Sequence, residues 1–231
     1  MYTKEETKGY GLEKLRELQR KIAARVVTED SIRKPLRTVA GLDLAYLNGE
    51  AVAAAVTMDY DTLRVIEEKT LVRKVSFPYI PTFLCFREGP PIIRLMGELK
   101  VDPDALMINA HGVAHPLFCG CASYVGVLLD KPTIGVAGSK LCGEYEGEPE
   151  KVGEWIPLTY EGEIVGAVLL SKRHCKPIFV SVGHKIGLNS AVEIVKHFLV
   201  SHRFPEPLRL AHVLANKVKR SLKTRCETKH R

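Results

Sequence analysis

Hydrophobic and polar residues along the chain repeat with helical spacing in some segments and with strand character in others. Apolar residues recur every three or four positions within residues 11–27, which predicts an amphipathic helix. Three runs with strand character follow, at residues 38–46, 51–58 and 63–68. Asn48 and Gly49 between the first two runs are a strong hairpin signal, and residues 59–62 form a turn-like break before the third. The pattern predicts a three-stranded antiparallel meander.

The rest of the chain alternates between the two patterns. Helical spacing predicts helices over residues 89–99, 118–129, 188–200 and 206–222. Apolar runs predict strands over residues 105–109, 132–137, 155–158, 163–170 and 178–182. Such alternation is typical of parallel strands joined by crossover helices. We therefore expect a ribonuclease H-like α/β fold, in which a mixed sheet of a meander plus parallel strands is flanked by helices, as a single domain over residues 1–231.

The composition is that of an ordinary soluble globular protein, with 45% hydrophobic and 26% charged residues. No segment approaches the roughly 18 uninterrupted apolar residues of a membrane helix, and the first residues are charged where a signal peptide would turn apolar. We expect a cytoplasmic protein without a membrane partner. The six cysteines lack the spacing of a disulfide framework, which predicts reduced thiols.

The formal net charge of +7 is concentrated at one end of the sequence. Residues 217–231 hold seven Lys or Arg residues and one Glu, so this segment carries six of the seven net positive charges. A basic C-terminal tail of this kind can follow a phosphate backbone. A solvated, frayed tail explains the same composition, and the sequence does not decide between the two.

The segment FPYIPTFLCFREGP, residues 77–90, holds a constrained aromatic side chain close to an acid. Pro78 and Pro81 fix their own φ angles and restrict the residues before them, so Tyr79 stands on a rigid extended arm. The simpler interpretation is a loop packed into the core, as for most apolar residues. A rigid aromatic arm, however, can separate stacked bases without first losing conformational entropy. Together with Glu88, the arm suggests nucleic-acid chemistry.

Asp43 lies in the middle of an apolar strand, where a carboxylate is costly unless it is paired, hydrogen-bonded or bound to a metal. Glu88 follows the aromatic arm, where the simpler interpretation is a favourable charge near a helix N-terminus. Hydrolysis of a phosphodiester commonly uses carboxylates from separate strands to hold one or two Mg²⁺ ions. A third ligand is expected at the tip of the strand at residues 105–109, and there the chain has Asn109.

At this point the motifs resemble those of the endonuclease V family over about residues 11–216. The matching segments are GLDLAY, FPYIPTFLCFREGP, NAHGVAHP, TIGVAGSKLCGE, PIFVSVGH and PEPLRLAH. The resemblance implies a ribonuclease H-like fold and dependence on Mg²⁺ or Mn²⁺. It also implies a wedge formed by PYIP, and cleavage of DNA at the second phosphodiester bond 3′ to deoxyinosine.

The resemblance also implies roles for particular residues. Catalysis is assigned to Asp43, Glu88, Asn109 and His212, and the first three are the expected metal ligands. Pattern alone would make His212 an ordinary buried histidine, whereas the family match gives it a metal-proximal or proton-transfer role. The expected DNA contacts are Tyr79, Pro81, Thr82, Gly112, Gly120, Gly135, Ser139 and Lys140, with the three glycines lining a pocket for the base.

Several positions depart from the family pattern. Asn109 stands where the family has Asp, Gly138 where it has Lys, and Thr82 where it has Gly. Loss of a carboxylate beside a cation removes a Coulomb attraction of at most about 4 kcal/mol at ~4 Å and an effective dielectric constant near 20. His111 as a nitrogen ligand and Lys140 as a phosphate contact are conceivable compensations, but the simpler interpretation gives both only local roles.

The sequence thus supports a metal-dependent endodeoxyribonuclease that repairs DNA containing deoxyinosine, and we expect it to act as a monomer. The alternative is a catalytically impaired paralogue that binds inosine-containing or single-stranded nucleic acid without cleaving it, which Asn109 and Gly138 favour. RNA is a third possible substrate, because no residue reads the 2′-hydroxyl unambiguously.

Overall fold

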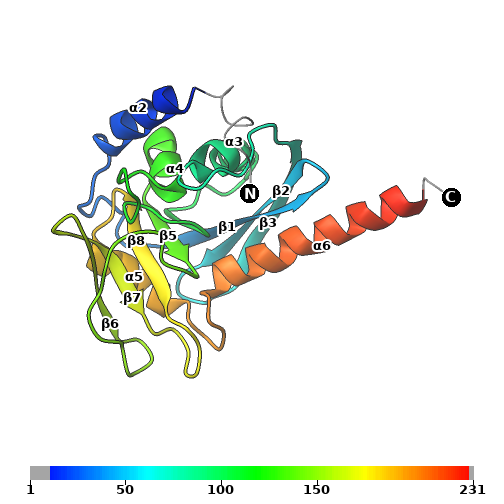
Figure 1. Ribbon diagram of the computed structural model, residues 1–231. Coiled ribbons are helices and arrows are strands. Elements are labelled where there is room, and N and C mark those ends of the chain that lie inside the picture. The colour runs from blue at the N-terminus through cyan, green and yellow to red at the C-terminus, as the bar shows by residue number, and fades with distance from the viewer. Residues whose placement is uncertain (1–10, 229–231) are drawn as a thin grey trace.

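An eight-stranded sheet forms the centre of the protein (Figure 1). The structure is a computed structural model that describes residues 11–228, with their side chains as far as residue 224. In chain order the strands are β1 (Thr38–Leu47), β2 (Glu50–Asp59), β3 (Val65–Lys74), β4 (Ala105–Ile108), β5 (Thr133–Ala137), β6 (Trp155–Tyr160), β7 (Glu163–Leu169) and β8 (Ile178–His184). Across the sheet their order is β3-β2-β1-β4-β5-β8-β7-β6.

The strand pairing follows the predicted division into a meander and a parallel part. β1, β2 and β3 pair antiparallel, and Asn48 and Gly49 form the turn between β1 and β2. β4 pairs parallel to β1, and β5 pairs parallel to β4. Beyond β5, the strands β8, β7 and β6 add a second antiparallel set. The predicted mixed sheet is confirmed.

Helices cover both faces of this sheet. They are α2 (Leu12–Ala23), α3 (Leu84–Met96), α4 (Cys121–Leu129), α5 (Leu188–His197) and α6 (Glu206–Thr228). α5 and α6 pack on one face, α3 and α4 pack on the other, and α2 lies against α4 (Figure 1). Each face therefore has its own hydrophobic core.

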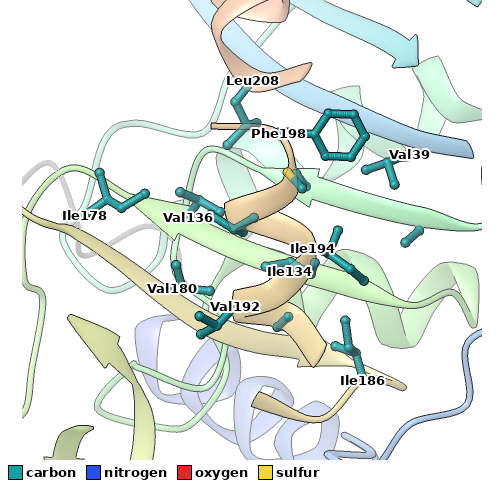
Figure 2. Close-up of a cluster of buried hydrophobic side chains, with 14 of the residues drawn as sticks. Val39, Ile134, Val136, Ile178, Val180, Ile186, Val192, Ile194, Phe198 and Leu208 are labelled. Atoms are coloured by element: carbon teal, nitrogen blue, oxygen red, sulfur yellow. The ribbon is translucent and has the colours of Figure 1, made fainter. Parts of the chain in front are cut away.

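The alternation of side chains along the strands divides the apolar residues between these two cores. Val39 packs in the core under α5 and α6, whereas its neighbour Ala40 packs in the core under α3 and α4. Figure 2 shows the first core, in which Val192 of α5 lies near Val180 of β8. Full burial of one such aliphatic side chain stabilises the fold by about 1.5–3 kcal/mol.

Helix α3 begins earlier than the sequence predicted. It starts at Leu84 rather than at residue 89, so Glu88 lies inside the helix and not at its N-terminus. Two prolines, Pro90 and Pro91, lie within the helix. Packing of its buried side chains against the sheet holds the helix despite these prolines. The interpretation of Glu88 as a helix-terminus charge is therefore wrong.

Two elements extend further into charged sequence than predicted. β3 was predicted to end at residue 68 but runs to Lys74, because its charged side chains are exposed at the edge of the sheet. α6 was predicted to end at residue 222 but continues to Thr228, so most of the predicted basic tail is helical. In Figure 1 this helix projects past the sheet. Residues 229–231 of the predicted tail lie outside the described residues.

Two compositional predictions can be compared with the described residues. Their cysteines, at positions 85, 119, 121, 142 and 175, are free, as predicted, and the side chain of Cys226 lies outside the description. None of the helices within residues 11–228 is long and apolar enough to cross a membrane.

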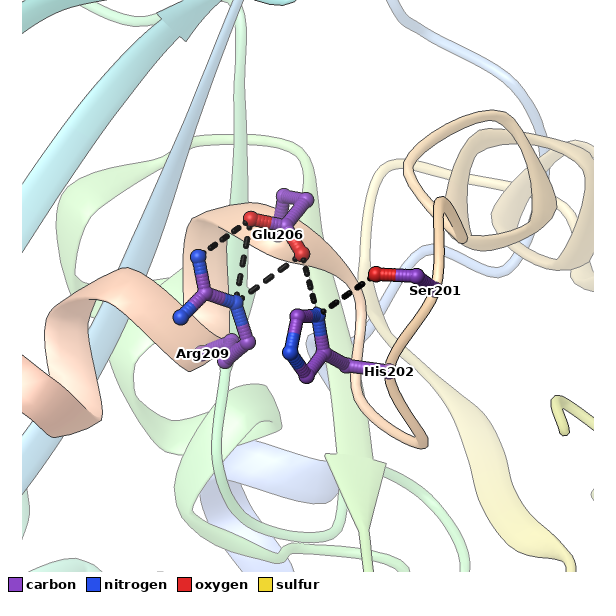
Figure 3. Close-up of polar contacts among 4 residues, drawn as sticks. All are labelled: Ser201, His202, Glu206 and Arg209. Carbon is purple, nitrogen blue, oxygen red and sulfur yellow. Dashed lines mark hydrogen bonds and ion pairs between the residues drawn. The ribbon is translucent and has the colours of Figure 1, made fainter.

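The first turn of α6 is held by an ion-pair cluster that Figure 3 shows. Arg209 donates hydrogen bonds of 2.7–3.0 Å to the Glu206 carboxylate, and His202 Nδ1 lies 3.0 Å from the same group. The Arg209 hydrogen bond is the main cause that lowers the pKa of Glu206. An acid at a helix N-terminus also interacts favourably with the helix dipole. The cluster fixes where α6 begins, which determines where its later side chains lie.

Gly41 lets α6 cross β1 in close contact. An added Cβ at this position would lie 2.5 Å from the backbone nitrogen of Leu208 and still closer to the Pro207 carbonyl. Real Cβ atoms do not approach backbone so closely, so any other residue here would push α6 away. Asp43 follows two residues later, and the packing of α6 therefore decides its surroundings.

We predict that Gly41→Ala destabilises the protein by roughly 2–3 kcal/mol, because the added methyl group overpacks the contact between β1 and α6. Gly97→Ala is the matched control, since its Cβ would meet only the Arg94 carbonyl, at an ordinary 3.5 Å. Urea denaturation of both variants checks the difference. Equal free energies of unfolding would contradict this account of Gly41.

Candidate active site

The four predicted catalytic residues come from four separate elements. Asp43 lies on β1, Asn109 directly follows β4, Glu88 lies in α3 and His212 lies in α6. β1 and β4 are parallel neighbours, so Asn109 follows the β4 end that lies beside the carboxyl-terminal half of β1. α3 and α6 approach from opposite faces. The fold brings side chains that are far apart in sequence to one place.

Asp43 is the centre of this group, and both of its carboxylate oxygens accept hydrogen bonds. Asn109 Nδ2 donates to Oδ1 at 2.9 Å, and His212 Nδ1 donates to Oδ2 at 2.7 Å. The Asp43 side chain is 8% exposed and that of His212 is 63% exposed. A buried carboxylate is tolerated in the sheet because these two donors compensate it.

The amide of Asn109 changes the electrostatics of the cluster. The carboxylate of Asp43 can only accept, so the amide turns its nitrogen toward it. An aspartate at the same position would place a second carboxylate against Asp43, and the two negative charges would need a cation or a proton between them. With asparagine the contact is a hydrogen bond within the protein.

Glu88 has an unusual protonation equilibrium. Its pKa is raised to about 7, mainly by burial and in smaller part by the nearby Asp43 charge. The Tyr46 hydroxyl donates to Glu88 Oε1 at 3.1 Å and favours the ionised form. The Arg87 guanidinium lies 4.2 Å from the centre of the Tyr46 ring. Sequence reasoning missed Tyr46, although a tyrosine three residues after a mid-strand acid was the available signal.

The predicted wedge forms one wall of a cavity of about 290 Å³. The opposite wall comes from the segments that follow β4 and β5. Six of the eight predicted DNA contacts line this cavity together with Asn109: Tyr79, Pro81, Thr82, Gly120, Ser139 and Lys140. Tyr79 is 57% exposed. The cavity and the acidic cluster share Asn109, so they are neighbours.

The other two predicted contacts, Gly112 and Gly135, are absent from the cavity lining. An added Cβ at Gly112 would overlap the Val182 carbonyl, and one at Gly135 would lie 2.5 Å from the Gly112 nitrogen. These glycines permit close packing of backbone behind the cavity wall.

The base of the wedge is fixed by two donors from distant parts of the chain. The Thr82 carbonyl accepts hydrogen bonds of 2.8 Å from both Gln19 Nε2 and His115 Nε2. His115 Nδ1 accepts from the Leu117 backbone nitrogen, which leaves the proton on Nε2. Burial lowers the pKa of His115 to about 4, so the ring is neutral at pH 7. Gln19 was missed by sequence reasoning, although a glutamine among the helix residues that face the core was a visible signal.

The backbone around Gly138 is covered by the segment that leads into α6. Arg203 Nη2 donates to the Gly138 carbonyl at 2.6 Å. An added Cβ at Gly138 would lie 3.2 Å from Cζ of Phe204, which is tighter than most contacts. The Phe204 ring therefore restricts the space beside the position where the family pattern has lysine.

The two residues considered as compensations contact other groups. His111 Nε2 hydrogen-bonds the Ser139 carbonyl at 2.9 Å, and Lys140 Nζ lies 5.5 Å from the centre of the Tyr145 ring. Within residues 11–228, no three His, Cys, Asp or Glu side chains are grouped so that they could hold a metal ion. A cation at the cluster would therefore need Asn109 as a ligand and an adjustment of the side chains.

Comparisons with known proteins agree with this architecture. A family model described as Endonuclease V matches residues 20–213. Endonuclease V of Roseiflexus sp. (strain RS-1) is 40% identical over 205 residues, which span 89% of this chain and 92% of that protein. The crystal structure of endonuclease V from Streptomyces avermitilis superposes with a TM-score of 0.85 at 36% identity, covering 91% of this chain and 94% of the other.

A further solved structure contains nucleic acid. Endonuclease V of Ciona intestinalis, in complex with a 24mer DNA containing an inosine followed by a ribo-adenosine, superposes with a TM-score of 0.80 at 27% identity. The alignment covers 91% of this chain and 98% of that one. These likenesses confirm the ribonuclease H-like fold. The chain belongs to the endonuclease V family.

Proposed function

We propose that the protein recognises deoxyinosine in DNA and cleaves the second phosphodiester bond 3′ to it with Mg²⁺ or Mn²⁺. The observation that carries the proposal is the cavity that joins the Tyr79 wedge to the cluster around Asp43 through Asn109. The complex of the Ciona intestinalis relative with inosine-containing DNA supports the same substrate. Inosine pairs weakly, so extruding it from a duplex costs less free energy than extruding a matched base.

The wedge and the cavity have separate tasks in this proposal. The two prolines hold Tyr79 exposed, so its ring can stack in the space that the extruded base leaves. Gly120 and Ser139 in the cavity wall give the base access to backbone groups. The neutral His115 holds the wedge in place at pH 7 through the Thr82 carbonyl.

The donor types in the cluster fit a hard divalent cation. Asp43 and Glu88 supply carboxylates, and Asn109 supplies an amide oxygen once its side chain rotates. When bound, such a cation activates water and stabilises the leaving oxygen. The set carries one negative charge fewer than three carboxylates would, so we expect weaker metal binding and slower turnover than the family pattern gives.

His212 is placed to handle a proton. Its Nδ1–H is directed at Asp43, which fixes the tautomer and leaves Nε2 to accept a proton. Nε2 lies 3.2 Å from Asn216 Nδ2, and the side chain is largely exposed. We assign it proton transfer at Nε2 during cleavage.

A second candidate function is binding of inosine-containing nucleic acid without cleavage. The hydrogen bond from Asn109 to Asp43 favours it, because the cluster is electrostatically satisfied by protein groups alone. The position of Gly138, which carries no cation and lies against Phe204, favours it as well. Both candidates share the wedge and the cavity, and they differ only in chemistry.

The first experiment incubates the purified protein with labelled oligonucleotides that carry one deoxyinosine, one adenine or one guanine at the same position. We expect preferential binding of the inosine strand and a nick at the second phosphodiester bond with Mg²⁺ or Mn²⁺. Selective binding without a nick under either metal supports the second candidate. Equal binding of all three strands contradicts both, and a matched RNA strand tests whether the preference extends to RNA.

The second prediction concerns Asn109. We expect Asn109→Asp to lower the melting temperature in EDTA, because a like-charged pair replaces a hydrogen bond, and to regain it when Mn²⁺ is added. The thermal shift with Mn²⁺ should exceed that of the unmodified protein, and thermal denaturation measures both. Asn189→Asp, an exposed position on α5, is the control for the added charge. An equal Mn²⁺ shift in all three proteins would contradict a metal role for position 109.

The third prediction concerns turnover. Asn109→Asp combined with Gly138→Lys should raise the cleavage rate by up to about a thousandfold, the rate equivalent of the ~4 kcal/mol Coulomb attraction. Because Phe204 restricts a side chain at 138, adding Phe204→Leu should increase the gain. Single-turnover rates on the inosine strand test the series. No gain in either combination would show that these positions do not limit catalysis.

The fourth prediction concerns the proton on Glu88. Its pKa is raised in the folded protein, so the unfolded chain loses its proton first and stability falls as pH rises from about 4.5 to 7. Glu88→Gln has no proton to lose and should become the more stable protein by roughly 3 kcal/mol near pH 8. Urea denaturation in EDTA across this range measures the difference. Tyr46→Phe should extend the loss of stability to higher pH, because it removes a hydrogen bond that lowers the Glu88 pKa. A pH-independent difference in free energy of unfolding between the unmodified protein and Glu88→Gln would refute the raised pKa of Glu88.

A further inference from the structure

A second hollow, of about 300 Å³, lies beside the residues that lead into the wedge. Its walls come from the end of β3, the residues that lead into the wedge, and α3. Four of its lining residues are cations, and none is an acid. We call this hollow the cationic groove and define it by Arg73, Lys74, Arg87 and Arg94.

Two of the four cations in the cationic groove have a neighbouring acid, since Glu98 pairs with Arg94 and the Arg87 charge acts on Glu88. Arg94 has an ion pair with Glu98 at 3.6 Å, and its own side chain is 65% exposed. Within residues 11–228, Arg73 and Lys74 have no ion pair within 4.0 Å, although Glu50 lies opposite Lys74 in the strand register. The groove is therefore a concave surface with excess positive charge, which attracts an anion.

The Arg87 side chain gives the groove a fixed wall. It donates to the Phe77 carbonyl at 2.5 Å and stacks over the Tyr46 ring. A guanidinium that is already oriented loses little conformational freedom when it binds a phosphate, and its planar donors match phosphate oxygens. A phosphodiester is thus the anion that this wall suits.

One continuous chain segment, residues 77–82, contributes to both the cationic groove and the base cavity. Phe77 lines the groove, whereas Tyr79 and Pro81 line the cavity. A base that enters the cavity draws its own strand to one side of Tyr79. The opposite strand of the duplex is then left on the other side, where the cationic groove begins.

We propose that the cationic groove binds backbone phosphates of the strand opposite the inosine. The inference rests on the proposed function, because it requires a duplex that the wedge has opened. In this arrangement the cavity receives the base, and the cationic groove receives the complementary backbone. Single-stranded DNA uses only the cavity.

The test is the variant Arg73→Glu/Lys74→Glu, which reverses two exposed charges. We expect its affinity for a duplex with one inosine to fall by at least about tenfold at low salt, and its affinity for the single inosine strand to stay unchanged. In Arg73→Ala/Lys74→Ala, the slope of log affinity against log salt should fall by about two for the duplex only. Fluorescence anisotropy with labelled strands measures both.

Arg33→Glu/Arg37→Glu is the matched control. These exposed arginines precede β1, about 30 Å along the strand from its carboxyl end. The control makes the same change in net charge and should keep duplex affinity near that of the unmodified protein. Melting curves confirm that each variant is folded.

Two outcomes would overturn the proposal. If Arg73→Glu/Lys74→Glu loses equal affinity for duplex and single strand, the groove binds the inosine strand itself. If it loses affinity for neither, the groove does not bind nucleic acid. Because the wedge opens a matched duplex less readily than an inosine duplex, the loss of affinity should be smaller when a paired guanine replaces the inosine. If this variant loses duplex affinity but the unmodified protein shows no preference for inosine, only the proposed function is contradicted.

Discussion

The Asp43 carboxylate is buried in the middle of a sheet, and the elements around it are arranged so that its charge is compensated. β4 ends beside it and supplies Asn109, while α6 crosses β1 closely enough at Gly41 to supply His212. A carboxylate left without these donors would cost several kcal/mol in so buried a position. The packing of α6 on β1 and the polar site therefore depend on each other. The close contact at Gly41 places His212, and His212 compensates the buried Asp43 charge.

The departures from the family pattern form a consistent set in three dimensions. Asn109 turns a contact between two charges into a hydrogen bond, and Gly138 is accompanied by the Phe204 ring and by the Arg203 hydrogen bond to its carbonyl. The Asp43 carboxylate keeps two hydrogen-bond donors, Asn109 and His212. Positions 109 and 138 both line the same cavity as the wedge residues Tyr79 and Pro81.

Hydrophobic period and turn signals predicted the mixed sheet, because burial on a sheet face dictates the sequence of each strand. Asp43 was identifiable for the same reason, as a charge where the period requires an apolar residue. Gln19 and Tyr46 escaped because their partners, Thr82 and Glu88, come from distant elements and pair only in the folded chain. The start of α3 was predicted five residues too late, in a segment where Pro90 and Pro91 lie inside the helix.

Thr82 has a φ angle of +71°, a left-handed conformation that a β-branched residue adopts only at a cost of about 1–3 kcal/mol. Gln19 and His115 hold its carbonyl and offset that strain. Gln19 lies on α2, which is itself anchored by Ile22 against Val127 of α4. The stiffness of the wedge is thus not a property of its prolines alone. It also depends on α2, so any loosening of that helix would change the position of the exposed Tyr79 ring.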